Sequence, residues 1–322
     1  MIRSDYILNI VFFNYNFLLL MNINPWYITG ITDGDGCFSV SIIKDNTTRL
    51  GWSVSLIYIL TAAANPANYL MLELINTYFN NIGRIITNPH DNTFNLKITG
   101  LINCLIVRDH FINYPLFTYK LVHFQLWCMI IDLIQSKQHL TWLGLLQIIG
   151  IKEHFKEGLS EKLLFNFPFY IPISTPVYNP LLFLMNIHWI CGFINSDGSF
   201  SLLIRKDAKL ILGERCSTEI SITQHSISLI VLERINSFLG YGSVKPKSDK
   251  PAYRFRISSL ANVNSFINLF KEAQFLGAKA LDYADFCKGV EIINSGKHLT
   301  QAGLESIRLL SKGMNSNRTK FE

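Results

Sequence analysis

The stretch ITGITDGDG, residues 28–36, recurs with the same pattern as ICGFINSDG, residues 190–198. Both copies follow a helix start signal, because Asn24 precedes a first-turn proline and Asn186 can cap a helix in the same way. Both copies also close on a glycine, which suits the end of a helix. The sequence therefore predicts two equivalent helices that end at these glycines.

An acid stands immediately before the closing glycine of each copy, at Asp35 and Asp197. The last carbonyl groups of a helix are unpaired and its dipole is negative there, so a carboxylate at this place is repelled. Either copy alone fits a turn after a core helix, since Asp and Gly are common turn residues. The repetition favours a bound cation, and carboxylate and carbonyl oxygens suit a hard divalent one. A calcium-binding loop fits less well, because the sequence lacks the glutamate that supplies the last ligand of such a loop.

Two further blocks of sequence repeat in the same order. MLELINTYF at 71–79 matches VLERINSFL at 231–239, and SKQHLTWLGLLQI at 136–148 parallels SGKHLTQAGLESI at 295–307. Blocks repeated at a common shift of roughly 160 residues indicate a duplicated domain. Prolines mark the linker between the copies. We expect an N-terminal extension, a first repeat, a linker, a second repeat and a C-terminal tail at residues 1–21, 22–158, 159–184, 185–315 and 316–322.

Each half shows the same order of predicted elements. The motif helix is followed by two strand patterns, a helix that ends near Gly83 or Gly242, two more strands and C-terminal helices. This order predicts an α+β fold in which each αββαββα repeat has its own antiparallel sheet.

Composition limits the class of protein. A chain of 322 residues allows two domains, and 49% hydrophobic residues exclude a disordered chain. The formal net charge of +6 fits a polyanionic partner and equally fits an ordinary surface. Six cysteines without C-x-x-C spacing argue against structural zinc and for a reducing compartment.

The first 21 residues contain an apolar run from Ile7 to Met21 that three asparagines interrupt. The run is shorter than the roughly 20 apolar residues of a membrane span, and it lacks the arginines of an import sequence. We interpret it as a loosely attached extension, with a membrane or targeting role as the alternative.

The duplicated motif, followed in each half by F-x-V or F-x-L strands, resembles that of the LAGLIDADG homing endonucleases in their single-chain, two-repeat form. The resemblance covers roughly residues 24–313. It implies saddle-shaped sheets and two motif helices packed side by side, where Gly30 and Gly192 permit close approach. It also implies that Asp35 and Asp197 hold Mg²⁺, or Mn²⁺ in its place, at the scissile phosphates. The carbonyl groups of Gly34 and Ser196 would be added ligands.

The same resemblance implies further catalytic residues near the attacking water. Lys120 and Lys279 stand in parallel places of the two repeats and would stabilise charge on the phosphate. Gln224 matches a glutamine of the family, whereas Ala64 is expected at the corresponding place of the first repeat. Asn195 replaces the motif's first acid, which Asp33 retains. Activity unequal for the two DNA strands is therefore expected, with a decayed nuclease as the alternative.

Strand periodicity gives an independent argument for a DNA partner. In CFSVSI at 37–42 and SFSL at 199–202, apolar and polar residues alternate, as in a sheet with one buried face. A twisted sheet with such a polar face can read base edges in the major groove, although an ordinary solvated face has the same pattern. The residues expected to contact DNA are Cys37, Ser39, Ser41, Arg84, Asn95, Lys97, Ser199, Ser201, Arg205, Lys245, Lys247, Arg254 and Arg256.

These observations together predict a site-specific, metal-dependent endonuclease of intron homing that cuts a long, asymmetric double-stranded DNA target. The duplication makes it a pseudo-dimeric monomer that needs no protein partner. Abundant Ile, Asn, Leu and Phe suggest an AT-rich genome, which with the resemblance indicates a soluble protein of a fungal mitochondrion. The alternatives are a maturase or decayed relative that assists splicing of the host intron RNA, and, from the mean hydropathy of +0.24, a membrane-associated protein.

Overall fold

The computed structural model of the protein describes residues 22–179 and 184–321. The expected N-terminal extension therefore lies outside the described residues. Within the described chain, the fold is α+β with two four-stranded antiparallel sheets, as the sequence predicts. No helix of this part of the chain has the length and apolar composition that a membrane crossing requires.

The two repeats have the same order of elements. The first repeat consists of α2 (Pro25–Asp35), β1 (Gly36–Lys44), β2 (Trp52–Ala63), α3 (Pro66–Tyr78), β3 (Arg84–Asn88), β4 (Thr93–Thr99), α4 (Leu101–Asn113), α5 (Lys120–Gln135) and α6 (Trp142–Lys152). The second consists of α8 (Ile187–Asp197), β5 (Gly198–Lys206), β6 (Glu214–His225), α9 (Leu229–Leu239), β7 (Ser243–Pro246), β8 (Ala252–Ile257), α10 (Leu260–Leu269), α11 (Gly277–Asn294) and α12 (Gln301–Lys312). The duplication in sequence is thus a duplication in structure.

The sheets have matching strand orders, β1-β2-β4-β3 and β5-β6-β8-β7. Alternate residues of β1 and of the first half of β5 are buried, and Phe38, Val40, Phe200 and Leu202 lie in the core. Helices of the same repeat pack on this apolar face, so the opposite, polar face of each sheet stays open. The alternation read from the sequence is therefore a real division between core and open faces.

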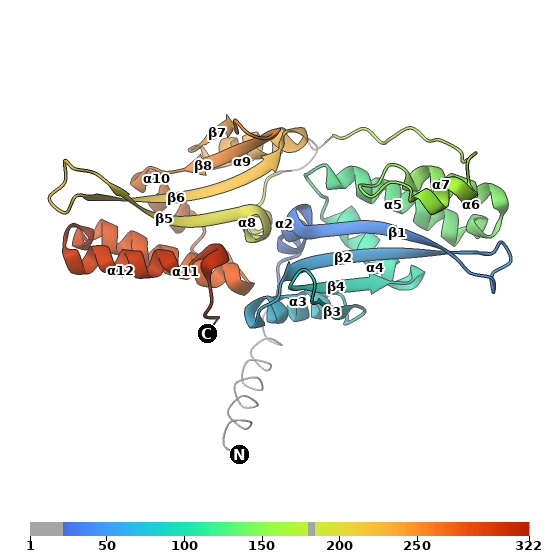
Figure 1. The fold of residues 1–322 in the computed structure, drawn as a ribbon, viewed down its shortest axis with the longest axis horizontal. Coiled ribbons are helices and arrows are strands. Elements are labelled where there is room, and N and C mark those ends of the chain that lie inside the picture. Colours follow the sequence, from blue (N-terminus) through green and yellow to red (C-terminus); the bar gives the residue numbers. More distant parts are fainter. Residues whose placement is uncertain (1–21, 180–183, 322) are drawn as a thin grey trace, which may run out of the picture.

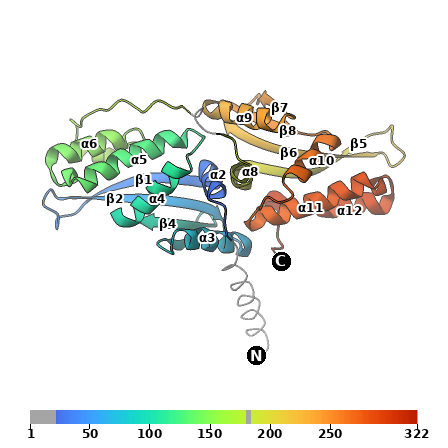
Figure 2. The ribbon, with the colours of Figure 1, turned by 180° about the vertical axis from the view of Figure 1, so that it is seen from behind.

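The repeats are related by an approximate half turn. In Figure 1, α5 and α6 lie above the first sheet on the right, whereas α11 and α12 lie below the second sheet on the left. Figure 2 shows the same relation from behind, with α4 beside the first sheet and α10 beside the second. The motif helices α2 and α8 meet at the centre, and this contact joins the two repeats.

The motif helices approach each other as closely as glycine allows. A Cβ atom on Gly30 would overlap the carbonyl oxygen of Trp189, and one on Gly192 would overlap that of Tyr27. At both helix starts the expected asparagine cap is present, and Asn24 Oδ1 accepts a hydrogen bond of 3.0 Å from the backbone N–H two residues on. Both predictions for these helices are confirmed.

The segment between the repeats is mostly irregular but contains one short helix, α7 (Glu161–Asn166). It packs along the first repeat, where the Tyr178 hydroxyl donates to the Phe117 carbonyl oxygen at 2.7 Å and Tyr170 donates to Glu153 at 2.5 Å. The described part of this segment is thus fastened to the helices of the first repeat.

Candidate active site

The two acids of the motif lie at adjacent helix ends. Asp35 is the last residue of α2 and Asp197 the last of α8, and each is followed by the glycine that begins a strand. A Cβ atom on Gly34 would overlap the Ser196 hydroxyl and lie 3.0 Å from Asp197 Oδ2. The backbone of one motif helix therefore lies directly against the carboxylate of the other.

Both acids line a cleft of about 710 Å³ at the junction of the two repeats. Its walls come from the end of α2, the start of α5 and the end of β6, so both halves of the chain build it. The lining side chains include Asp35, Cys37, Lys120, His123, Lys156, Asp197, Gln224, His225 and Lys250. Cations thus surround the two carboxylates.

Removal from water and mutual repulsion make the acids reluctant to ionise. Burial is the main cause that raises the pKa of Asp197 to about 6, and the charge of Asp35 raises it further. Desolvation also raises the pKa of Asp35, while the charges of Lys120 and Lys279 oppose this increase. A cation bound between the carboxylates would remove this penalty.

Each repeat places a lysine beside its motif glycines, as expected from the sequence. Lys120 Nζ donates to the carbonyl oxygen of Thr32 at 3.1 Å and to that of Gly34. Lys279 Nζ donates to the Gly198 carbonyl oxygen at 2.8 Å. Burial lowers the pKa of both lysines, and the nearby carboxylates oppose this decrease. The ammonium groups therefore lie near the acid pair, and each is hydrogen-bonded to backbone carbonyl oxygens.

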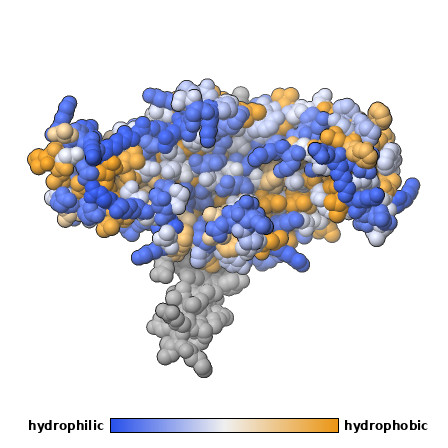
Figure 3. All heavy atoms as spheres, viewed as in Figure 1, coloured by the Kyte–Doolittle hydropathy of each residue, from blue (hydrophilic) through white to orange (hydrophobic). Residues whose placement is uncertain are grey.

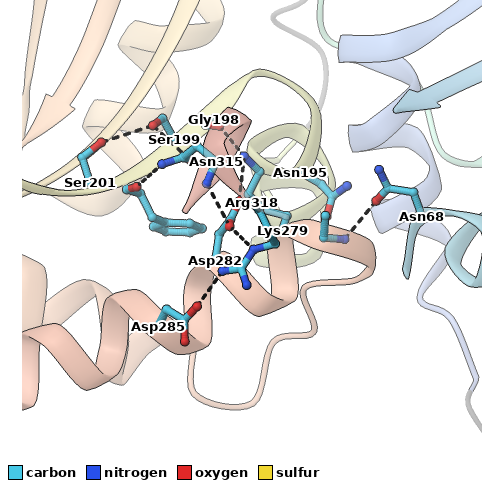
Figure 4. A network of polar contacts seen from close by, with 12 residues as sticks. Asn68, Asn195, Gly198, Ser199, Ser201, Lys279, Asp282, Asp285, Asn315 and Arg318 are labelled. Atoms are coloured by element: carbon cyan, nitrogen blue, oxygen red, sulfur yellow. Dashed lines mark hydrogen bonds and ion pairs between the residues drawn. The ribbon is translucent and has the colours of Figure 1, made fainter. Parts of the chain in front are cut away.

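Lys279 also belongs to a polar network that the sequence did not reveal (Figure 4). Asp282 lies 4.0 Å from Lys279 Nζ and accepts a hydrogen bond of 2.7 Å from Arg318, while Asn315 donates to it through its backbone N–H. The Asn315 side chain in turn donates to the carbonyl oxygen of Phe200. Residues beyond α12 therefore hold Asp282 in place beside Lys279. The sequence contained one sign of this network, because Asp282 follows Lys279 by three residues and lies on the same face of one helix.

Gln224 lies where the resemblance placed it. Its Nε2 donates to Asp197 Oδ2 at 2.5 Å, which fixes the carboxylate from the β6 side. Among the assigned catalytic residues, Asp35, Asp197, Lys120 and Gln224 line the same cleft, and Lys279 interacts with both acids from the opposite side.

The first repeat has no glutamine at the equivalent place, but the residue there is not Ala64. The glycine that ends each motif helix pairs with Leu60 in the first sheet and with Ile222 in the second. Two residues further along the strand, Ala62 therefore corresponds to Gln224. The assignment of Ala64 is wrong by two positions, because Ala64 lies beyond the end of β2. Alanine still stands at the site, so the predicted asymmetry remains.

The first acid of the motif borders the cleft, but its carboxylate is taken up by hydrogen bonds within the protein. Asp33 is buried and accepts hydrogen bonds from the backbone N–H groups of Phe117 and Thr118, and from the Trp189 indole N–H at 2.8 Å. It thereby holds the start of α5, which carries Lys120. In the second repeat, Asn195 at this position donates to the sulfur of Met71 in the first repeat.

The donor set fits a hard divalent cation. It would consist of the two carboxylates, the Gly34 carbonyl group, which also accepts from Lys120, and the expected Ser196 carbonyl group, all oxygen ligands. Within residues 22–179 and 184–321, no group of three or more His, Cys, Asp or Glu side chains is placed to hold a metal ion.

The residues predicted to contact DNA lie on the open sheet faces or at their ends. Arg84 and Lys97 are directly opposite in neighbouring strands of the first sheet, as are Lys245 and Arg254 in the second. Residues opposite each other in an antiparallel pair share a face. Lys247 lies just beyond β7. Predicted positions in the first sheet include Cys37, Ser39, Ser41 and Asn95, and those in the second Ser199, Ser201, Arg205 and Arg256.

The family model of the LAGLIDADG endonucleases matches residues 28–131 and 190–290, one segment in each repeat. The chain belongs to this LAGLIDADG family. Over 93% of its length it is 31% identical to "Probable intron-encoded endonuclease 3" of Neurospora crassa, and it spans 55% of that relative's length.

Solved structures of the LAGLIDADG homing endonuclease I-SmaMI are similar throughout. I-SmaMI bound to cleaved DNA is 31% identical and superposes with a TM-score of 0.86, over 92% of this chain and 98% of that one. I-SmaMI bound to uncleaved DNA in the presence of calcium ions gives a TM-score of 0.84 at 31% identity, over 91% of this chain and 99% of that one.

Proposed function

We propose that this LAGLIDADG protein is a site-specific endonuclease that cuts both strands of a double-stranded DNA target. The observation that carries the proposal is the acid pair Asp35 and Asp197 at adjacent helix ends, in a cation-lined cleft between two sheets with open polar faces. One acid from each repeat matches one scissile phosphate on each strand of a duplex. The likeness to I-SmaMI bound to DNA supports the same partner.

The side chains of the cleft have distinct roles in this reaction. Divalent cations held by Asp35 and Asp197 would neutralise charge on the phosphate and activate water. Lys120 and Lys279 approach from the two sides and stabilise negative charge that develops on the phosphate oxygens. Gln224 keeps the Asp197 carboxylate in place and can orient a water molecule beside it.

The finer parts of the proposal concern the cation and the place of action. Mg²⁺ is the proposed cofactor, with Mn²⁺ able to substitute, while Ca²⁺ would support binding with little cleavage. The relatives named as intron-encoded support a role in intron homing, and a cox1 intron protein of Schizosaccharomyces pombe is among them. We place the protein in a fungal mitochondrion on this basis. Host intron RNA is a further proposed partner.

Substituting the acids tests the proposal. Asp35→Asn and Asp197→Asn should each abolish double-strand cleavage while DNA binding survives, because each acid serves a cation rather than a base. Asp132→Asn, on the exposed side of α5, is the matched control and should cut normally. The substrate is a plasmid that carries the intron-insertion site, assayed with Mg²⁺, Mn²⁺, Ca²⁺ or a chelator.

Three outcomes separate the interpretations. Wild-type rates in both acid variants would contradict the assignment of Asp35 and Asp197. Full cleavage in the chelator would contradict the metal mechanism. Specific binding without cleavage under any metal would instead favour a decayed nuclease or a splicing factor, which an assay of host intron splicing with and without protein would then distinguish.

A further inference from the structure

The open faces of the two sheets differ in chemistry at equivalent positions. Strand register aligns Glu219 with Ile57, Ser221 with Ile59, and Lys245 with Ile86. At these three positions the second sheet carries charged and hydroxyl groups where the first carries isoleucines, whereas Leu203 and Ser243 stand where the first sheet has Ser41 and Arg84. Figure 3, which has the viewpoint of Figure 1, shows hydrophobic residues among hydrophilic ones over both repeats, so the difference lies in these particular positions.

In the second sheet, one buried acid holds two arginines. Glu219 is only 5% exposed, and its two oxygens lie 2.5 Å from Arg254 Nη2 and 2.6 Å from Arg256 Nε. Arg254 Nη2 also donates to the Ser221 hydroxyl at 3.0 Å. The arginine side chains remain 43% and 42% exposed, so each keeps N–H donors for a partner on the open face.

An acid is unexpected on a surface that meets DNA, because its charge opposes the phosphates. Glu219 is retained there with one oxygen hydrogen-bonded to Arg254 and the other ion-paired with Arg256, which holds both guanidinium groups beside it. Arginine donors fixed in this way suit the N7 and O6 acceptors of guanine in the major groove. The acid thus acts through the arginines, as a positioning residue.

The first sheet offers a different contact. Ile57 and Ile59 are half-buried on the open face of β2, and Ile86 is 47% exposed on β3. Cys37 lies opposite Ile59, and Asn95 lies opposite Ile86. Apolar side chains on a DNA-facing surface pack against the C5-methyl group of thymine, and asparagine suits adenine. Around these side chains the face favours A·T pairs, while Lys97, opposite Ile59, and Arg84 beside it add cations to the same face.

We propose that the two halves of the DNA target differ in composition, with guanines under Arg254 and Arg256 as positioned by Glu219, and thymines under Ile57, Ile59 and Ile86. The inference rests on the proposed function, since it names the bases that the same surface would read.

A randomised duplex library tests the guanine half. The full chain, with Ca²⁺ present, selects bound duplexes, and base frequencies are counted in each half. Guanine should be enriched in one half, and Glu219→Gln should reduce that preference by about 5- to 150-fold without altering the other half. Arg215→Ala removes a cation from the same face outside the cluster, so it should weaken all sequences alike.

Uracil tests the thymine half with the unaltered protein. Replacing thymine by deoxyuridine removes only the methyl group, so binding should weaken about fourfold for each contacted base. The loss should occur in the half that Glu219→Gln leaves unchanged. A double variant with Ile57→Ser and Ile59→Ser should no longer distinguish the two bases.

The outcomes separate this inference from the proposed function. The inference would be overturned if Glu219→Gln left the guanine preference unchanged. It would also be overturned if deoxyuridine were tolerated equally in both halves. Either result would leave site-specific binding intact. A library without any enriched sequence would overturn both.

Discussion

Single side chains make the two halves of the cleft unequal. Gln224 donates to Asp197, whereas Ala62 at the equivalent place has no group that could hold Asp35. The two strand-cutting steps should therefore differ in rate, and nicked DNA should accumulate transiently. Gln224→Ala should slow one strand by about 10- to 100-fold, as for other groups that orient a metal-binding carboxylate.

A time course on supercoiled plasmid with strand-specific labels checks this asymmetry. Ala62→Gln is the reciprocal variant and should bring the two rates closer together. Linear product without a nicked intermediate in the wild type would count against unequal steps.

His110 links the first motif helix to α4 and makes stability depend on pH. Its ring nitrogens bond to the Thr29 hydroxyl at 3.3 Å and the Tyr78 hydroxyl at 2.9 Å. Burial lowers the pKa of His110 from 6.5 to about 3. The neutral ring is therefore favoured in the folded state, and its contribution to stability is present above pH 6.5 and lost as the pH falls towards 3.

The histidine should contribute at most about 1.4 kcal/mol of unfolding free energy per pH unit within that window. His110→Gln should flatten the loss of stability between pH 6.5 and 4, whereas exposed His90→Gln should leave it unchanged. Urea melts at several pH values measure both. An unaltered slope in His110→Gln would show that another group dominates acid unfolding.

At the scale of elements, the contact between α2 and α8 decides whether the acids meet. Gly30→Ala should destabilise the protein by about 1–3 kcal/mol or more, because its Cβ atom would overlap a backbone oxygen that cannot move freely. Gly313→Ala is the control, since its nearest atom would be 3.6 Å away. Thermal unfolding compares the two variants, and equal melting temperatures would contradict the close packing.

The whole molecule presents two open sheet faces that together carry an excess of cations. DNA affinity should therefore fall steeply with salt, with log affinity linear in log salt concentration. Lys245→Ala should reduce this slope by about one if the lysine contacts a phosphate. Lys288, which pairs with Asp285 on α11, is the matched control. A flat salt dependence in the wild type would argue against a nucleic acid partner.

Local and repeated features were predictable from the sequence alone. The caps at Asn24 and Asn186, the acids at the helix ends and the alternation of the strands follow from rules that act over a few residues. The duplication made the arrangement of the repeats predictable as well, since two similar domains pack against each other through the same surface, here the motif helices. Gly30 and Gly192 marked that surface, because only glycine permits such close backbone contact.

Tertiary structure alone decided which distant side chains meet. The pairing of Glu219 with Arg254 and Arg256 depends on strand register, and a shift of one residue would move these side chains to opposite faces. The same register, rather than the count of residues along the chain, makes Ala62 the counterpart of Gln224. Side-chain neighbours arise from the packing of separate elements, so a pattern along one segment determines its own structure but not its partners.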